Sequence, residues 1–423
     1  MGDLKMPSAD TLAADPAAAQ RRILKVLVAS QILSGAGLAA GITVGALLAQ
    51  DMLGTTGLAG LPSALFTAGS ALTAIGVGRI SQSRGRRPGL AVGYLTGALG
   101  SLGVITAAVI DSSALLFVAL FVYGAGSATN LQARYAGADL AAPTHRARAV
   151  STVLVATTLG GVVGPNLAAP TGGLAATFGI PRLAGPFLLS GAAYAAAALV
   201  LAFCLRPDPL LLARVVDEKS DRVAAHATGA AAAGDGAPAK PRGGVVLGAL
   251  VMVLTQLVMV AIMTMTPIRM HDHGHGTAAS GLVIAVHVGS MYLPSPLTGR
   301  LVDRCGRIAV AATSGVTLFA AGLVAALAPD DSVGLLALAL ALLGLGWNLG
   351  LVSGTAIITD TVPLATRAKT QGMVDVSIAI AGATGGLASG VVVDLAGYPV
   401  LALTGGILAL AVLPAVAATA HGR

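Results

Sequence analysis

Four side chains in the second half of the sequence have the types and spacing of a site for a soft metal ion. Met259 and Met263 are four residues apart in one apolar run, and His287 and Met291 are four apart in the next. Residues four apart lie on one face of a helix. Thioether and imidazole groups suit copper, and thioethers suit Cu(I) in particular, whereas hard ions prefer oxygen. The pattern therefore indicates copper binding, provided that the two runs are helices and meet at one depth.

The lengths of the two runs place these side chains at one level. We expect antiparallel neighbouring helices near 244–268 and 278–302, so that Met259 and His287 each lie nine residues from the same end. At the rise of an α-helix this depth is about 13 Å, near the middle of a bilayer, where transporters hold their substrates. Methionine is also a common gap-filler in apolar helices, so packing is the competing interpretation.

A histidine-rich tract lies between the two runs. It contains Met270, His271, His273 and His275. Such a tract can collect metal ions, and from this loop an ion would reach Met263 first. A solvated polar loop explains the tract equally well.

The composition requires a membrane. Of 423 residues, 55% are hydrophobic and 10% are charged, and the mean hydropathy is +0.85, whereas soluble domains carry about 25% charged residues. The net charge of +7 does not indicate nucleic-acid binding, because the basic residues form short clusters between apolar runs. No P-loop of the GxxxxGK[ST] form occurs, and we expect neither an ATP-driven pump nor an enzyme.

Twelve apolar runs are long enough to cross about 30 Å of hydrocarbon. Arginine and lysine gather at the loops on one side of these runs, which predicts cytoplasmic N- and C-termini. We therefore expect an all-α membrane protein with a cytoplasmic tail (1–22), a six-helix half (23–205), a flexible cytoplasmic linker (206–243) and a second six-helix half (244–420) that carries the metal site. The expected spans are 25–49, 56–78, 88–109, 113–139, 148–171, 184–205, 244–268, 278–302, 307–328, 332–359, 369–394 and 398–420.

The two halves are related by an internal repeat at an offset of 221 residues. GRISQSRGRR, which begins at Gly78, matches GRLVDRCGRI, which begins at Gly299, and Asp139 and Arg146 match Asp360 and Arg367. At this offset the four candidate ligands correspond to Leu38, Ile42, Phe66 and Ser70. The repeat therefore does not require methionine or histidine at those places.

The repeated loop resembles the motif that follows the second helix of each half in the major facilitator superfamily. The resemblance covers nearly the whole chain and implies two pseudo-symmetric six-helix halves. In that family the loop combines a tight glycine turn with charges that hold helix ends together. Because the second copy has Asp303 where the first has Gln82, we expect a stronger charged latch in the second half. The residues assigned to this latch are Gly78, Gly85, Arg86, Gly299, Asp303, Arg304, Gly306 and Arg307.

The pair MVAIM (259–263) and HVGSM (287–291) resembles the CcoA-like copper importers of that superfamily. The resemblance implies a monomer in the bacterial inner membrane that imports copper by alternating access for cytochrome oxidase assembly. Copper would be the transported ion, with no prosthetic group, and membrane lipid and a copper chaperone would be the partners, with no nucleic acid. Relatives in that branch resemble vitamin transporters, so an importer or exporter of a small organic compound, such as a riboflavin-like vitamin or a drug, stays open. A non-transporting copper sensor on the same scaffold is a further alternative.

Other polar residues lie inside the expected spans. Arg134 and Asp375 are ionisable, and such groups within a membrane are functional candidates by default. Asp375 is a candidate for proton binding or for pairing with Arg134, and a purely structural ion pair is an equal alternative. Trp347 and Asn348 are candidates for lining a cavity.

Overall fold

The computed structural model is all-helical and describes residues 15–53, 61–228 and 242–421. Predictions for 1–14, 54–60, 229–241 and 422–423 lie outside these residues. The first half contains α2 (Pro16–Leu53), α3 (Leu61–Arg84), α4 (Arg86–Val109), α5 (Ser113–Ala138), α6 (Arg146–Asn166), α7 (Ala168–Thr177) and α8 (Gly185–Cys204), with the short turns η1 (Pro143–His145) and η2 (Arg182–Ala184). The second half contains α10 (Arg242–Asp272), α11 (Thr277–Tyr292), α12 (Ser295–Cys305), α13 (Arg307–Leu327), α14 (Val333–Thr361), α15 (Arg367–Ala396), α16 (Tyr398–Ala409) and α17 (Val412–His421).

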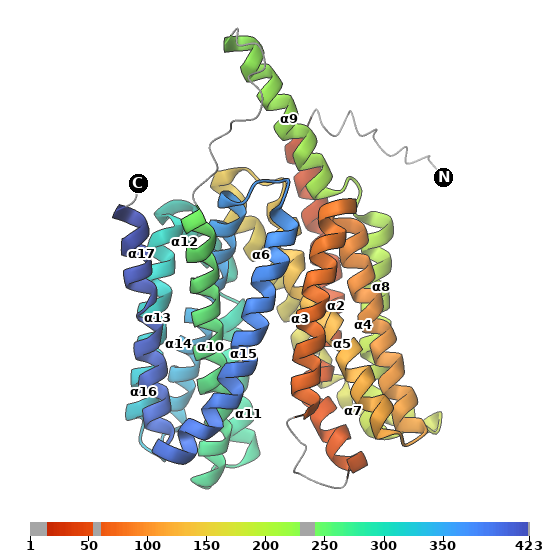
Figure 1. The fold of residues 1–423 in the computed structure, drawn as a ribbon. Coiled ribbons are helices and arrows are strands. Elements are labelled where there is room, and N and C mark those ends of the chain that lie inside the picture. Colours follow the sequence, from red (N-terminus) through yellow and green to blue (C-terminus); the bar gives the residue numbers. More distant parts are fainter. Residues whose placement is uncertain (1–14, 54–60, 229–241, 422–423) are drawn as a thin grey trace.

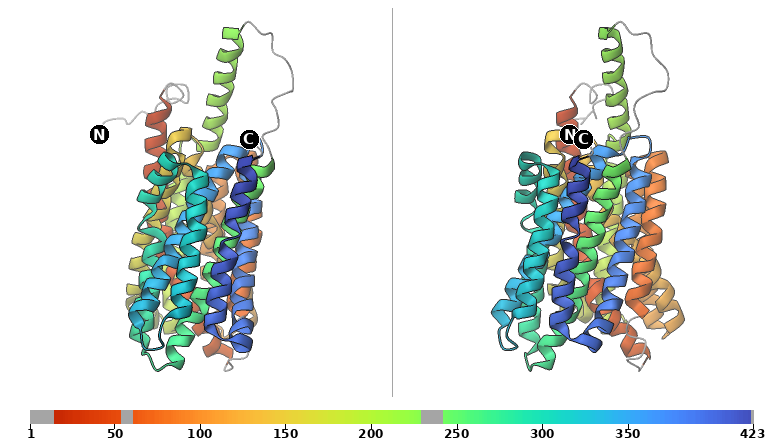
Figure 2. Two further views of the ribbon diagram at one scale, coloured as in Figure 1. Left: turned by 90° about the vertical axis from the view of Figure 1, so that its left-hand side faces the viewer. Right: turned by 60° about the vertical axis from the view of Figure 1, so that its left-hand side comes forward.

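The helices form two bundles that lie side by side, with α2–α8 in one and α10–α17 in the other (Figure 1). Their axes run in a common direction, and the start of α2, α9 and the end of α17 lie at one end of the molecule (Figure 2). We call this end the α9 end. Each half has its own apolar core, and the second core extends to the first half through Ala138, Ala147, Val150 and Leu154.

Nine helical segments of the described residues are long and apolar enough to cross a membrane. The three other expected spans fall on α2, on α6 with α7, and on α11 with α12. The last two of these are each interrupted by a break, at Leu167 and at Leu293–Pro294. Twelve crossings and the orientation of the chain stay predictions.

The sequence predicts a flexible linker between the halves, but part of this segment is helical. α9 (Pro209–Thr228) is a helix that projects beyond both bundles (Figure 1). Asp208 caps it, because its Oδ1 accepts hydrogen bonds from Leu210 N at 3.0 Å and Leu211 N at 3.2 Å. Such a cap satisfies N–H groups that have no partner within the helix. The expectation of flexibility is therefore wrong for 209–228.

Candidate functional site

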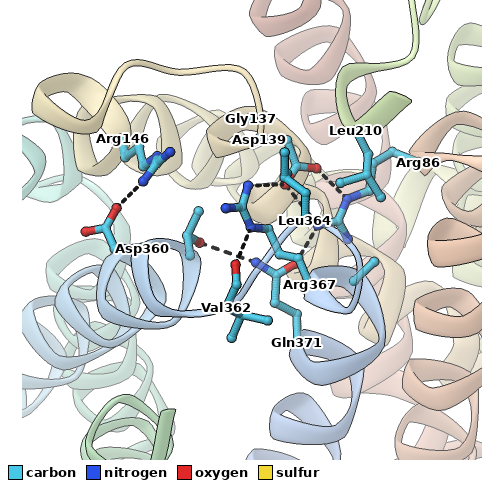
Figure 3. A network of polar contacts seen from close by, with 12 residues as sticks. Arg86, Gly137, Asp139, Arg146, Leu210, Asp360, Val362, Leu364, Arg367 and Gln371 are labelled. Atoms are coloured by element: carbon cyan, nitrogen blue, oxygen red, sulfur yellow. Dashed lines mark hydrogen bonds and ion pairs between the residues drawn. The ribbon is translucent and has the colours of Figure 1, made fainter. Parts of the chain in front are cut away.

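The two halves are joined at the α9 end by a network of charges that obeys the repeat. Arg86 Nε donates to Asp139 Oδ2 at 2.7 Å, and both side chains are fully buried. At the same offset of 221, Arg307 pairs with Asp360, and Arg146 on the first half also reaches Asp360. We call these five side chains, with Gln82, Asp303, Arg367 and Gln371, the interhalf latch. Figure 3 shows six of its members: Arg86, Asp139, Arg146, Asp360, Arg367 and Gln371.

The latch crosses between the halves at corresponding places. Arg146 of the first half pairs with Asp360 of the second, and Arg367 of the second lies 4.0 Å from Asp139 of the first. Gln371 breaks this symmetry, because its Oε1 accepts from Arg86 and its Nε2 donates to Thr359 Oγ1 at 3.3 Å. The fully buried part of the latch therefore consists of Arg86, Asp139 and Gln371.

Gln82 and Asp303 perform the same task on opposite halves. Asp303 accepts hydrogen bonds from Ala147 N and Arg148 N, both at 3.1 Å, at the start of α6. Gln82 Oε1 accepts from the equivalent Ala368 N and Lys369 N, at 2.8 and 3.4 Å, at the start of α15. Unlike a carboxylate, the amide also donates, to Leu364 O at 3.1 Å and Ala365 O at 2.7 Å. The expectation of a stronger latch in the second half is therefore not supported.

The glycines assigned to the latch have two different jobs. Gly85 and Gly306 turn the chain at φ of 96° and 91°, a conformation that favours glycine. Gly78 and Gly299 let helices of opposite halves approach, since a Cβ at Gly78 would lie 2.9 Å from Ala368 O and one at Gly299 would lie 2.8 Å from Ala147 O. The exposed Arg304 at the end of α12 takes no part in the latch contacts of the described residues.

We expect Gln82→Ala to weaken closure of the α9 end about as much as Asp303→Ala. Each removes an acceptor of two cross-half N–H bonds, and the loss is about 0.5–1.5 kcal/mol, because these N–H groups are part-buried or exposed and water can replace the acceptor. The measurement is the free energy of unfolding in detergent micelles. Ser83→Ala is the control, because among the described residues this exposed hydroxyl bonds only within α3. A loss for Asp303→Ala alone would contradict the equivalence of the two side chains.

A second cross-half cluster lies deeper, where α5 meets α14 and α15. Arg134 Nη2 donates to Asp375 Oδ1 at 2.7 Å, and Tyr135 Oη donates to the same oxygen at 3.1 Å. Arg134 Nε donates to Thr355 Oγ1 at 3.0 Å, and that hydroxyl lies 3.7 Å from the sulfur of Met252. The side chains of Arg134 and Asp375 are 0% and 3% exposed. The structure thus contains an ion pair between Arg134 and Asp375, one of the alternatives that the sequence left open, and a functional role for either residue stays a prediction.

The candidate copper ligands lie on helices that share a neighbour. α10 packs on α14, α15 and α16, while α11 packs mainly on α14, and α10 and α11 touch each other only slightly. The expectation that they are close neighbours is wrong, because α14 is the helix that both of them pack against. Met259 and Met291 are buried in the apolar core of the second half, and Met263 is partly buried against it.

His287 is fully buried on α11 and held by one hydrogen bond. Its Nδ1 lies 2.9 Å from Leu340 O on α14. A carbonyl oxygen only accepts, so Nδ1 carries the proton and Nε2 keeps its lone pair. This Nε2 has no hydrogen-bond partner in the described part of the chain.

The histidine-rich tract is different from the expected loop. α10 continues past Pro267 to Asp272, so Met270 and His271 belong to its last turn, and Met270 packs in the core. His273 Nε2 lies 3.4 Å from Asp330 Oδ1, and His275 Nε2 lies 2.7 Å from Asp330 O. Among the described residues no group of three or more His, Cys, Asp or Glu side chains could hold a metal ion. The collecting role of this tract stays a prediction.

Asp330 joins this tract to the end of α10. Arg269 Nη2 donates to Asp330 Oδ1 at 2.8 Å and lies over the ring of Tyr398, with 4.7 Å between the guanidinium carbon and the ring centroid. The hydrogen bond from Arg269 lowers the pKa of the Asp330 carboxyl from its ordinary value, and the charges of His273 and Arg269 add to this effect.

Trp347 and Asn348 have separate roles. Trp347 Nε1 donates to Gln256 Oε1 at 2.7 Å, and its ring meets that of Tyr292 edge-on, with centroids 5.7 Å apart. This aromatic–amide cluster joins α10, α11 and α14. Asn348 instead bridges the break between α11 and α12, since its Nδ2 donates to Met291 O at 2.7 Å and Ser295 Oγ at 2.6 Å.

Sequence reasoning missed Gln256, Tyr292, Thr355 and Gln371 as parts of these clusters. The offset of 221 could have pointed to Thr355, because it is the repeat equivalent of Arg134. No comparable signal in the sequence joins Gln256 to Trp347, which are 91 residues apart.

The fold and the repeated latch define a two-half membrane carrier, and comparison with known proteins supports this. The family model of the Major Facilitator Superfamily matches residues 27–291 and 248–421. The chain belongs to the major facilitator superfamily, whose members are carriers and not enzymes.

Among similar proteins, the MFS-type transporter YdeG of Bacillus subtilis, described as uncharacterized, is 57% identical over 94% of this chain and 91% of its own. The riboflavin transporter RfnT of Brucella anthropi is 33% identical over 85% of this chain and 86% of its own. The human organic anion transporter MFSD10 shares the fold, with a TM-score of 0.75 at 18% identity, over 94% of this chain and 99% of that chain. None of these names supports the copper importer branch.

Proposed function

We propose that the protein is a secondary transporter that carries a small organic compound with an aromatic group across the bacterial inner membrane by alternating access. The observation that carries the substrate class is the aromatic–amide cluster of Trp347, Tyr292 and Gln256, set among three helices of one half. Sites for small organic molecules combine aromatic walls with a few polar groups that orient the ligand. The 33% identity to a riboflavin transporter agrees with such a substrate.

The latch supports alternating access. Every cross-half hydrogen bond and ion pair described above joins segments at or near the α9 end. If the clusters of basic residues make this end cytoplasmic, the structure represents a conformer that is closed to the cytoplasm. Opening at this end must then break the latch, so its contacts help to set the balance between the two conformers.

Trp347 also offers a direct test, because it is the only tryptophan in the chain. We expect riboflavin, used as the first probe, to quench its fluorescence in the purified protein, and lumichrome and glucose serve as an aromatic and a non-aromatic comparison. Gln256→Ala frees the indole and is expected to weaken quenching about tenfold or more in apparent affinity, since a polar anchor is worth about 1.5 kcal/mol. Leu338→Ala, an exposed position on α14, the helix of Trp347, is the control. The hypothesis of an aromatic organic substrate is contradicted if neither riboflavin nor lumichrome quenches the fluorescence of Trp347 or is taken up.

Copper import is the second candidate, and one observation favours it. The unpartnered Nε2 of the buried His287 has the lone pair that a metal ligand needs, and Met259, Met263 and Met291 would supply thioethers. Cells with the parent protein are compared for radioactive copper uptake with cells carrying Met259→Ala, Met263→Ala, His287→Ala or Met291→Ala. If all four variants are present in the membrane and accumulate copper like the parent, the hypothesis of copper import is contradicted.

A further inference from the structure

The aromatic–amide cluster belongs to the second half alone. At the offset of 221 residues, its members Gln256, Tyr292 and Trp347 correspond to Gly35, Ala71 and Gly126. One half therefore folds with only a hydrogen atom or a methyl group at all three positions. Because the shared scaffold does not require these large side chains, their contact in the second half calls for another explanation.

Trp347 points from α14 into the angle between α10 and α11. On one side of it, a Cβ at Gly344 would lie 2.5 Å from His287 O on α11. On the other side, a Cβ at Gly350 would lie 2.4 Å from the side chain of Thr255 on α10. Residues three apart differ by about 60° around a helix axis, so Trp347 lies between these two directions. α10 and α11 touch each other only slightly and do not close this angle.

The cluster lies near the boundary between the halves. On the same helix, Thr355 accepts a hydrogen bond from Arg134 Nε of the first half at 3.0 Å. Leu131 on α5 of the first half packs against the apolar core of the second half, as Tyr292 does. Transporters built from two repeats bind their substrates at the interface between the repeats.

The indole fixes the direction in which the amide of Gln256 points. Trp347 Nε1 donates to Gln256 Oε1 at 2.7 Å. An indole N–H only donates, whereas an amide has an oxygen that accepts and an NH₂ group that donates. The oxygen must therefore face the indole, and the NH₂ group faces away from it. Among the described residues this Nε2 has no hydrogen-bond partner, and Gln256 is partly exposed.

Gly382 on α15 leaves space beside this NH₂ group. A Cβ at Gly382 would lie 3.2 Å from Gln256 Nε2, so a larger residue would crowd the amide. One turn farther along α15, a Cβ at Gly386 would lie 3.6 Å from Val260, which is an ordinary contact. The two glycines therefore offer a matched pair of positions for a test.

We propose that Gln256 selects the substrate by its polarity, so that the transporter takes planar aromatic compounds with a hydrogen-bond acceptor, a carbonyl oxygen or a ring nitrogen, at the ring edge. This inference rests on the proposed function and narrows its substrate class. The ring packs against Trp347 and Tyr292, and Gln256 Nε2 donates to the acceptor. A compound that offers only a donor at this place leaves two donors facing each other without an acceptor, which weakens binding.

The test compares three tricyclic probes of similar shape and different polarity. Fluorenone has a carbonyl acceptor, carbazole has an N–H donor, and fluorene has neither. Their affinities are measured by equilibrium dialysis against the full-length protein in detergent micelles, with binding to empty micelles subtracted. We expect the parent to bind fluorenone about fivefold more tightly than either other probe, as one neutral hydrogen bond provides. In Gln256→Met, which has a side chain of similar length without the amide, fluorenone is expected to lose this advantage.

Further variants test the orientation of the amide. Trp347→Phe keeps an aromatic ring but lacks the N–H that orients Gln256, so carbazole is expected to gain affinity until it equals fluorenone. This gain tests the proposal even if Gln256→Met does not fold. Gly382→Ala is expected to reduce the preference for fluorenone, and Gly386→Ala is its matched control. Tyr292→Phe is expected to retain the preference, because a phenolic hydroxyl both donates and accepts.

The possible outcomes separate this proposal from the proposed function. Equal affinities of the parent for fluorenone and carbazole, or a preference for fluorenone that persists in Gln256→Met, would overturn the selection by Gln256 and leave an aromatic substrate intact. If none of the three probes binds to the parent, the aromatic substrate itself is contradicted, and the selection by Gln256 is overturned with it.

Discussion

Replacing Gly78 by valine is expected to abolish most transport by holding the α9 end open. A Cβ at this position would lie 2.9 Å from Ala368 O and 3.2 Å from the Cα of Gly372 on α15. Backbone atoms cannot move aside by changing a rotamer as a side chain can, so the close packing of α3 on α15 becomes strained. Strain of about 1–3 kcal/mol corresponds to about a 5- to 150-fold shift toward the open conformer.

The measurement is the distance between labels on the two halves, with uptake of the transported compound as a second readout. Gly76→Val on the same helix is the control, because no atom of the described residues lies within 4 Å of a Cβ there. Gly299→Val is expected to act like Gly78→Val through the equivalent contact with α6, where a Cβ would lie 2.8 Å from Ala147 O. Parent-like distances in both strained variants would show that these close approaches do not control opening.

The second large effect is expected for Asp139→Ala. This change leaves the fully buried Arg86 without its carboxylate, and breaking a buried ion pair in this way costs about 3–5 kcal/mol. The equivalent Asp360→Ala is expected to cost only about 1 kcal/mol, because its pairs with Arg146 and Arg307 are partly exposed to water. The two residues have the same role in the repeat, so burial is the variable that differs.

Unfolding of both variants by denaturing detergent, followed through the fluorescence of Trp347, gives the two free energies. The double variant Arg86→Leu, Asp139→Leu serves as the control, since removing both charges is less costly than leaving one buried without a partner. Equal losses for Asp139→Ala and Asp360→Ala would contradict the view that burial makes the first half the stronger part of the latch.

The repeat made much of the α9 end predictable. The backbone turns at Gly85 and Gly306, and helices approach closely at Gly78 and Gly299. Each of these positions requires a residue without a side chain, and glycine is visible in a sequence. The role of Gln82 was misjudged because residue type alone suggested a lost charge. Only its surroundings show that an amide can accept from two N–H groups and donate to two carbonyls.

The candidate copper site was predicted from spacing and depth along two helices. Spacing along each helix follows from helix geometry, and depth follows from the rise per residue, so both can be calculated from sequence. Which helices become neighbours is decided by packing, and here α14 packs against both α10 and α11. Spacing and depth alone could not show this.

Composition and the offset of 221 residues by themselves determined a membrane-embedded, all-helical chain of two related halves with a charged contact at one end. These properties follow from local hydropathy and from the internal repeat, and both can be read directly from the sequence. The tertiary structure decided that Arg134 meets Asp375, that Trp347 meets Gln256, and that Arg86 is buried while Arg307 is not. These facts depend on residues far apart in sequence and on the exclusion of water between packed helices, which no local pattern records.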